Sequence, residues 1–360
     1  MTVRIRPHLL ELPSYRAGRR PNQVAAENAV KLSSNESPFP LLPGVAESIA
    51  AATPEVNRYP DSSQGPLRDL LADNLGVDAG RVVVAGGSMT IFGPLLQCVV
   101  AEGDEVVFAW RTFEAPITAT AVLAGRPVFV PLRDSRHDLS AMADAMTERT
   151  RAVVVCNPNN PTGTVVHTEE LLQFLKRVPP ETLVVLDEAY HDFATDPEVP
   201  DGMELLRSGH ENLAVLRTFS KAQGLAGLRI GYCVTSERLA TVLTRLVPVF
   251  SVSRLAEAAA IASIGREASD EKDRRTQLVV AERERIRTRL REVGIDTPRS
   301  EANFVWLPVG ESSAQLTEKL EAEGVIARAY PPDGMRVTVG LPEENDAFLA
   351  AAIPLLQQND

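Results

Sequence analysis

Residues 213–229 read Leu-Ala-Val-Leu-Arg-Thr-Phe-Ser-Lys-Ala-Gln-Gly-Leu-Ala-Gly-Leu-Arg. The apolar run at the start of this stretch predicts a buried strand, and Lys221 follows it among hydroxyl residues and glycines. Burial favours the neutral amine of a lysine over the ammonium, and a neutral amine can attack a carbonyl to form a Schiff base. A solvated loop lysine is the alternative, because most lysines lie at the surface. The residues that follow the neighbouring strands must decide between the two.

Short Val-rich runs recur along the chain from residue 80 and mostly alternate with helical segments. They occupy residues 81–85, 105–110, 127–132, 151–156, 183–186, 213–216 and 230–234. Continuous apolarity indicates strands that are covered on both faces, which is typical of a mainly parallel seven-stranded sheet in an α/β domain. No Gly-x-Gly-x-x-Gly follows the first run, so a dinucleotide-binding fold has no support.

The length of 360 residues predicts more than one domain. Residues 1–44 contain six prolines and are expected to form an extended arm. Residues 45–250 hold the Val-rich runs and should form the large domain. Residues 251–360 begin with a long charged helical region, 255–293, and continue with mixed strands and helices, which indicates a smaller α+β domain.

Composition excludes several classes of function. The formal net charge of −11 leaves no basic surplus for nucleic acid or an anionic membrane. The three cysteines, Cys98, Cys156 and Cys233, lie far apart in or beside apolar runs, which argues for reduced core residues and against zinc or disulfides. Charged residues interrupt the first 13 positions, so no signal peptide is evident and a cytoplasmic location is expected.

Ligands of open α/β sheets collect beyond the carboxyl ends of the strands, so the residues after each run carry the functional prediction. Residues 86–90, Gly-Gly-Ser-Met-Thr, could present backbone N–H groups to a phosphate or form a plain turn. Residues 157–163 contain two Asn-Pro steps, which also suit a tight turn. Asp187 directly follows a buried run, where it needs a neighbouring cation or acts as a helix N-cap.

The spacing of these residues allows one shared pocket. Asn160 and Asp187 are 27 positions apart, and Asp187 and Lys221 are 34 apart, each close to the length of one βαβ unit. A carboxylate, amide and phenol donors, a lysine and an anion cradle are what pyridoxal 5′-phosphate (PLP) requires for its ring nitrogen, phenolic oxygen, aldehyde and phosphate.

With these motifs in place, the chain resembles fold-type I PLP-dependent aminotransferases of the histidinol-phosphate and aromatic amino-acid group. The resemblance covers nearly the whole chain. It is carried, in order, by residues 31–36, 57–61, 159–163, 187–190, 217–229 and 335–339.

The resemblance implies a role for each matching residue. Lys221 would carry the cofactor as a Schiff base and then move the substrate proton, and Asp187 would keep the pyridine nitrogen protonated. Tyr190 and Asn160 would bind the phenolic oxygen, and Phe113 would stack on the ring. The residues implied to bind the phosphate are Gly87, Ser88, Met89, Thr218, Ser220, Arg229 and, from a second subunit of a homodimer, Tyr59.

On the substrate side, the resemblance gives Arg336 and Asn35 to the α-carboxylate, with a strand-edge ion pair as the alternative for Arg336. Arg328 would bind a substrate phosphate, serve a dicarboxylate, or do neither. Tyr15 and Tyr330 add aromatic surface near the expected substrate side. Met89 and Thr90 replace the acidic pair that is usual in histidinol-phosphate enzymes, and the position of Phe113 usually holds tyrosine.

These features favour an aromatic amino acid, phenylalanine or tyrosine, as the amino donor and 2-oxoglutarate as the acceptor in a ping-pong transamination. Histidinol phosphate is the alternative donor. A PLP-dependent decarboxylase would use the same scaffold, and a sensor of this fold would need an appended domain, whereas only a short arm precedes the sheet.

Overall fold

The structure is a computed structural model that describes residues 3–12 and 29–357. The described residues form a main sheet of seven strands, each of which matches a run predicted from the sequence. In order across the sheet, the strands are β2 (Val82–Ala85), β8 (Gly231–Val234), β7 (Leu213–Thr218), β6 (Leu183–Asp187), β5 (Thr150–Cys156), β3 (Glu105–Trp110) and β4 (Arg126–Pro131). All neighbours are parallel except the two pairs that β8 makes, so the predicted mainly parallel sheet is confirmed.

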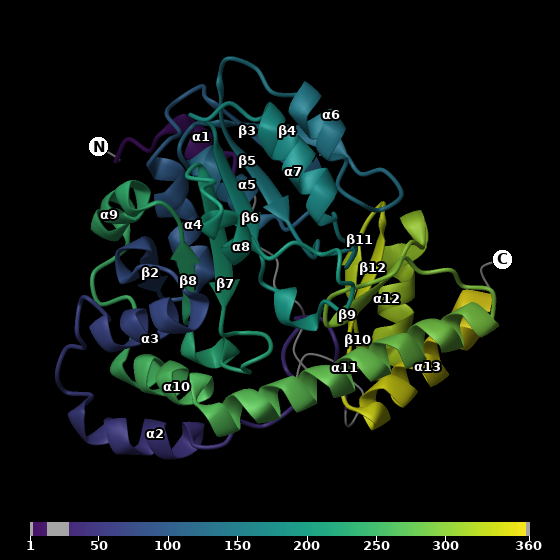
Figure 1. Cartoon of the computed structure of the whole chain (residues 1–360). Coiled ribbons are helices and arrows are strands. Elements are labelled where there is room, and N and C mark those ends of the chain that lie inside the picture. Colours follow the sequence, from purple (N-terminus) through teal and green to yellow (C-terminus); the bar gives the residue numbers. More distant parts are fainter. Residues whose placement is uncertain (1–2, 13–28, 358–360) are drawn as a thin grey trace.

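Helices cover both faces of the main sheet (Figure 1). Successive strand residues such as Val106 and Val107 are fully buried in two different apolar clusters, one on each face, which explains the continuous apolar runs. One face carries α4 (Ser88–Gln97), α5 (Ala115–Val122) and α9 (Glu237–Leu246). The other face carries α2 (Val45–Ala52), α3 (Gly65–Leu75), α6 (Leu139–Asp144), α7 (Thr168–Arg177), α8 (Gly202–Arg207) and α10 (Arg254–Ile264).

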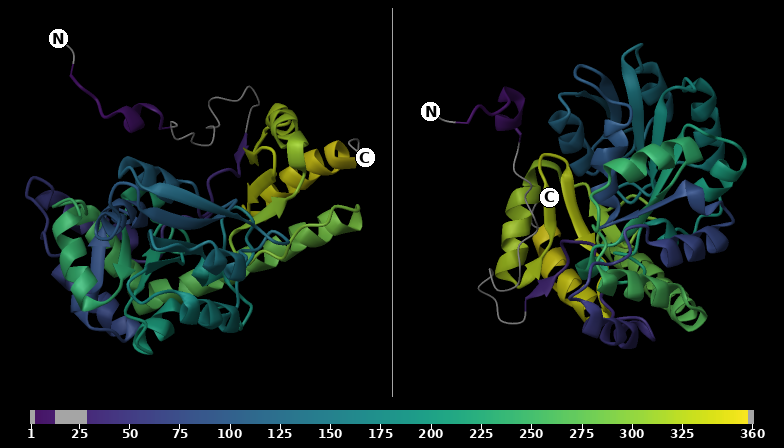
Figure 2. Two further views of the ribbon diagram at one scale, coloured as in Figure 1. Left: turned by 90° about the horizontal axis from the view of Figure 1, so that it is seen from above. Right: turned by 90° about the vertical axis from the view of Figure 1, so that its left-hand side faces the viewer.

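The C-terminal elements gather on one side of the main sheet, as both views of Figure 2 show. Their core is a three-stranded antiparallel sheet in the order β11 (Arg328–Tyr330), β12 (Gly334–Thr338), β9 (Phe304–Leu307). The helices α11 (Arg266–Glu292), α12 (Ser313–Ala322) and α13 (Pro342–Gln357) pack against this core. From the arm, β1 (Val30–Lys31) pairs in parallel with β10 (Val325–Ile326), which brings the residues after β1 to the space between the two sheets.

Two local expectations needed correction. The helical region expected over residues 255–293 is two helices, because Gly265 adopts an extended conformation (φ −57°, ψ 154°) between α10 and α11. The arm also includes a short helix, α1 (Pro7–Leu10), beside α5. Since α10 contributes Ala256 and Ala259 to the core of the main sheet, the helices beyond residue 250 are shared between both parts. The division at residues 44 and 250 stays a prediction.

Cys98, Cys156 and Cys233 are free, and the last two are buried. None of the helices in the described ranges combines the length and the apolar character that a membrane crossing requires.

Candidate active site

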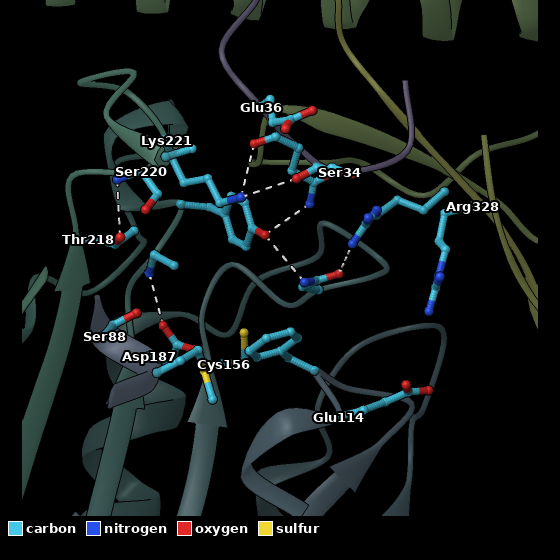
Figure 3. A pocket seen from close by; sticks show the side chains of 18 of the residues that line it. Ser34, Glu36, Ser88, Glu114, Cys156, Asp187, Thr218, Ser220, Lys221 and Arg328 are labelled. Atoms are coloured by element: carbon cyan, nitrogen blue, oxygen red, sulfur yellow. Dashed lines mark hydrogen bonds between the residues drawn. The ribbon is translucent and has the colours of Figure 1, made fainter. Parts of the chain in front are cut away.

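A cavity of about 350 Å³ lies at the carboxyl ends of β5, β6 and β7, where the main sheet faces β11 and β12 (Figure 3). It collects side chains from the arm, the main sheet and the C-terminal sheet. Of the residues predicted from the sequence, those that line it are Asn35, Ser88, Met89, Phe113, Asn160, Asp187, Tyr190, Thr218, Ser220, Lys221, Arg229, Arg328 and Arg336.

Lys221 points into this cavity from the loop after β7. Its Nζ donates hydrogen bonds to the backbone oxygens of Asn35 at 3.0 Å and Ser34 at 3.4 Å. Burial, helped by the positive charge of Arg336, lowers the pKa of Lys221 to about 7. A large fraction of the amine is therefore neutral near pH 7, as a nucleophilic lysine requires.

Asp187 is the last residue of β6 and is buried on the floor of the cavity. The N–H of Ala189 donates to its carboxylate at 3.2 Å. Burial raises the pKa of Asp187 to about 6. Within residues 3–12 and 29–357, no cation pairs with Asp187 within 4 Å, so the neighbouring positive charge that the sequence predicts is not a side chain of this part. A positively charged ligand atom would supply it.

Tyr190 stands beside Lys221, and the Nζ atom lies 5.5 Å from the centre of its ring. The Tyr190 hydroxyl accepts hydrogen bonds from the side-chain amides of Asn35 at 2.9 Å and Asn160 at 3.3 Å. Burial raises the pKa of Tyr190 above its usual range. The phenol therefore stays protonated and can donate to a ligand oxygen.

A second end of the cavity is built for an anion. Helix α4 begins there at Ser88, so its first backbone N–H groups have no partner within the helix. Gly87 precedes it with φ +97°, and a Cβ added at Gly87 would lie 2.6 Å from Nη2 of Arg229. The hydroxyls of Thr218 and Ser220 line the same end, with Ser220 Oγ 3.5 Å from Nη1 of Arg229. Only glycine allows the arginine to approach the helix so closely.

Arg336 lines the cavity from β12 of the C-terminal sheet and is buried. Its guanidinium donates to Oδ1 of Asn160 at 2.5 Å and to the backbone oxygen of Ser33 at 2.7 Å, whereas Nε has no hydrogen-bond partner. Among the described residues it forms no ion pair, so the strand-edge ion pair considered as its alternative has no support there. Arg336 thus keeps a free charge for an anionic group.

Three predicted residues lie elsewhere. Gly87 does not line the cavity but supports it, as described above. Tyr59 is 79% exposed and stacks on Phe250 at 4.6 Å, so it takes no part in the cavity of its own chain. Tyr15 lies outside the described residues.

The sequence prediction missed several lining residues, notably Ser34, Glu36, Glu114 and Cys156. Cys156 ends β5 and lies beside Asp187 in Figure 3. Its signal was its place directly before the first Asn-Pro step. Ser34 and Glu36 flank Asn35 in the motif of residues 31–36, but no sequence pattern predicted that their side chains would face the cavity.

The cavity fits PLP. The buried Asp187 lacks a cation, Lys221 offers a partly neutral amine, Tyr190 and Asn160 are grouped, and the end formed by Ser88 and Arg229 suits a phosphate. These are complementary features at separate points of one cavity.

Comparison with known proteins gives the class. The family model for aminotransferase class I and II matches residues 27–353, and the chain belongs to this family. The family resemblance and the fold inferred from the sequence motifs are thereby confirmed.

Individual proteins similar to this chain include curated relatives and solved structures. An aromatic amino acid aminotransferase of Streptomyces avermitilis is 48% identical, with 96% of each chain covered. One of Nocardia farcinica is 49% identical over 98% of this chain and 97% of its own. Among solved structures, histidinol-phosphate aminotransferase from Sinorhizobium meliloti, in complex with PLP, is 28% identical, has a TM-score of 0.91 and covers 100% of this chain and 99% of its own.

Proposed function

We propose that this aminotransferase binds PLP and transfers the amino group of an aromatic amino acid, phenylalanine or tyrosine, to 2-oxoglutarate by a ping-pong mechanism. The observation that carries the proposal is the meeting of Lys221, Asp187 and Arg336 in one cavity. The aromatic donor is supported by relatives with that name that are 45–49% identical over nearly the whole chain.

Each residue then has a task set by its position. When bound, PLP supplies an electron sink for the bond that breaks at the substrate α-carbon. Lys221 would hold the cofactor through its Nζ and, once released by the donor, move the α-proton. Asp187 would keep a proton on the ring nitrogen, because its buried carboxylate needs a positive neighbour.

The other residues would orient the two molecules. Tyr190 and Asn160 would bind the phenolic oxygen, Phe113 would stack on the ring, and Arg336 and Asn35 would bind the α-carboxylate. The phosphate would be held by the N–H groups of Ser88 and Met89 and by the side chains of Thr218, Ser220 and Arg229.

We further propose that the enzyme works as a cytoplasmic homodimer in which Tyr59 reaches the phosphate site of the partner subunit. Tyr59 is exposed and does not line the cavity of its own chain, and the free cysteines agree with a reducing compartment. Residues 1–44, 45–250 and 251–360 are proposed as arm, large domain and small domain.

Histidinol phosphate remains a second candidate donor because of Arg328. The Arg328 side chain lines the cavity, with its guanidinium 5.6 Å from the centre of the Tyr330 ring. Within the described ranges Arg328 forms no ion pair. A free guanidinium there would suit a phosphate or a second carboxylate.

A donor panel with 2-oxoglutarate tests the proposal. The kcat/KM for phenylalanine or tyrosine should exceed that for histidinol phosphate and aspartate by at least about tenfold. A preference for histidinol phosphate that disappears in Arg328→Gln would instead establish the second candidate.

A further inference from the structure

The hairpin of β11 and β12 forms the wall of the cavity that faces the substrate. Arg328 and Tyr330 line the cavity from β11, and Arg336 lies across from Arg328 in the pairing of the two strands. The guanidiniums of both arginines lie 5.6 Å from the centre of the Tyr330 ring, and the rings of Tyr330 and Trp306 pack in a T-shaped arrangement with their centres 5.8 Å apart. Tyr330 is the aromatic surface of this wall.

Arg111, which directly follows β3, attaches the tip of the hairpin to the end of the main sheet. Its Nε and Nη2 both donate to Oδ2 of Asp333, at 2.8 and 2.5 Å, and Nη2 also donates to the backbone oxygen of Pro331 at 3.2 Å. The Arg111 side chain is 12% exposed and that of Asp333 is 42% exposed. The ion pair therefore lies outside the lining of the cavity, with one partner largely shielded from water.

Arg111 is itself held firmly on the other wall. Its backbone oxygen accepts a hydrogen bond from Nδ2 of Asn159 at 3.1 Å, its Nη1 contacts Glu114 at 3.3 Å, and its guanidinium lies 4.4 Å from the centre of the Trp110 ring. Glu114 and the adjacent Phe113 line the cavity, whereas Arg111 does not. The side chain thus connects the two walls from outside.

We propose that Arg111 and Asp333 are positioning residues that set the separation between the wall of Phe113 and the wall of Tyr330, and so the fit of a large donor side chain. This inference rests on the proposed function. When the ion pair is broken, the hairpin tip loses its charged attachment, and Tyr330 is no longer held at a fixed distance from Phe113. A bulky aromatic donor would lose more contact than a donor with a small side chain.

The test uses the holoenzyme and its half-reaction, followed by the cofactor absorbance after a donor is added. Asp333→Asn keeps the shape of the side chain and removes its charge. We expect the apparent dissociation constant for phenylalanine to rise about fivefold while that for alanine changes less than about twofold, with the limiting rates and the affinity for PLP nearly unchanged. Arg111→Gln should behave alike, and the double variant should be no worse than either single variant.

The control is Asp144→Asn. Asp144 pairs with Arg177 at 2.6 Å, between α6 and α7, and it does not line the cavity. It should leave both donors unaffected. Equal losses for phenylalanine and alanine in Asp333→Asn, or no loss for either, would overturn the inference. Failure of the unaltered enzyme to react with any aromatic donor would contradict the proposed function instead.

Discussion

Lys221 and Asp187 show how one physical cause prepares two residues for opposite tasks. Burial disfavours charge, so it lowers the pKa of Lys221 to about 7 and raises that of Asp187 to about 6. The lysine gains a neutral amine. The ionised carboxylate of Asp187 is stable in this buried position only beside a positive charge.

The pH dependence of cofactor capture follows from the lysine. Below pH 7 Lys221 is mostly an ammonium, so the rate at which the apoenzyme captures PLP should fall about tenfold per pH unit, and above pH 7 it should level off. Stopped-flow absorbance between pH 5.5 and 9 measures this rate, with N-acetyl-lysine as the control for the ionisation of PLP. A rate that keeps rising up to pH 10 would indicate an unshifted lysine.

Gly87→Ala should weaken cofactor binding. The new Cβ would lie 2.6 Å from Nη2 of Arg229, and the residue would keep a φ of +97°, so the guanidinium must move away. Losing one charge-assisted hydrogen bond to the phosphate predicts a rise in the dissociation constant of PLP of roughly 10- to 100-fold. Fluorescence titration measures it. Gly93→Ala, in the same helix with nothing within 4 Å of its Cβ, is the control, and equal affinities for both variants would refute the cradle.

At the residue scale, the sequence predicted the side chains that directly follow strands, because the carboxyl ends of parallel strands meet at one edge. It did not predict the hydrogen bond from Lys221 to the Asn35 backbone or the one from Asn35 to Tyr190. Those contacts depend on β1 pairing with β10, and two residues of strand carry too little pattern to reveal a partner nearly 300 positions away.

Among the elements, the seven strands of the main sheet were predictable because their two-sided burial gives continuous apolar runs. The break at Gly265 was not. A single glycine within a charged helical pattern is tolerated in many helices, so only the packing of α10 on the main sheet and of α11 across to β9 makes this one a boundary.

Helix α11 is attached to its neighbours by a buried arginine, which gives a stability prediction. Arg283 is 0% exposed and donates to the backbone oxygens of Phe193 and Ala302, both at 3.1 Å, and it lies 3.6 Å from the buried Glu301. Arg283→Ala should lower the free energy of unfolding by about 3 kcal/mol, because it leaves two carbonyls and a carboxylate less well satisfied.

Urea unfolding measures this loss. Arg289→Ala, which removes an arginine that is 56% exposed on the same helix, should change the free energy of unfolding by less than about 0.5 kcal/mol. Similar values for the two variants would mean that the buried arginine contributes little.

For the whole molecule, the proposed homodimer rests on what one chain leaves exposed. Tyr59 (79% exposed) lies with Phe250 (41%), close in sequence to Val56 (56%) and Val249 (70%). Such apolar exposure suits a contact with a second copy. The sequence motif around Tyr59 suggested that this residue contacts the phosphate site of a partner subunit, a contact that requires a second chain.

Subunit complementation tests this arrangement. Tyr59→Ala should bind PLP weakly and Lys221→Ala should be inactive. After subunit exchange in an equal mixture at limiting PLP, hybrid dimers should restore about a quarter of the native sites, because each hybrid has one site with both residues intact. No recovery of activity would show that Tyr59 does not act across an interface.

The central claim is that the cavity around Lys221 transaminates an aromatic amino acid. The most direct measurement is a single turnover of the PLP-loaded enzyme with phenylalanine and no acceptor. The account predicts loss of the cofactor absorbance band and release of one equivalent of phenylpyruvate per subunit, with none from Lys221→Ala. Release of carbon dioxide without an oxo acid, or undiminished turnover in Lys221→Ala, would contradict it.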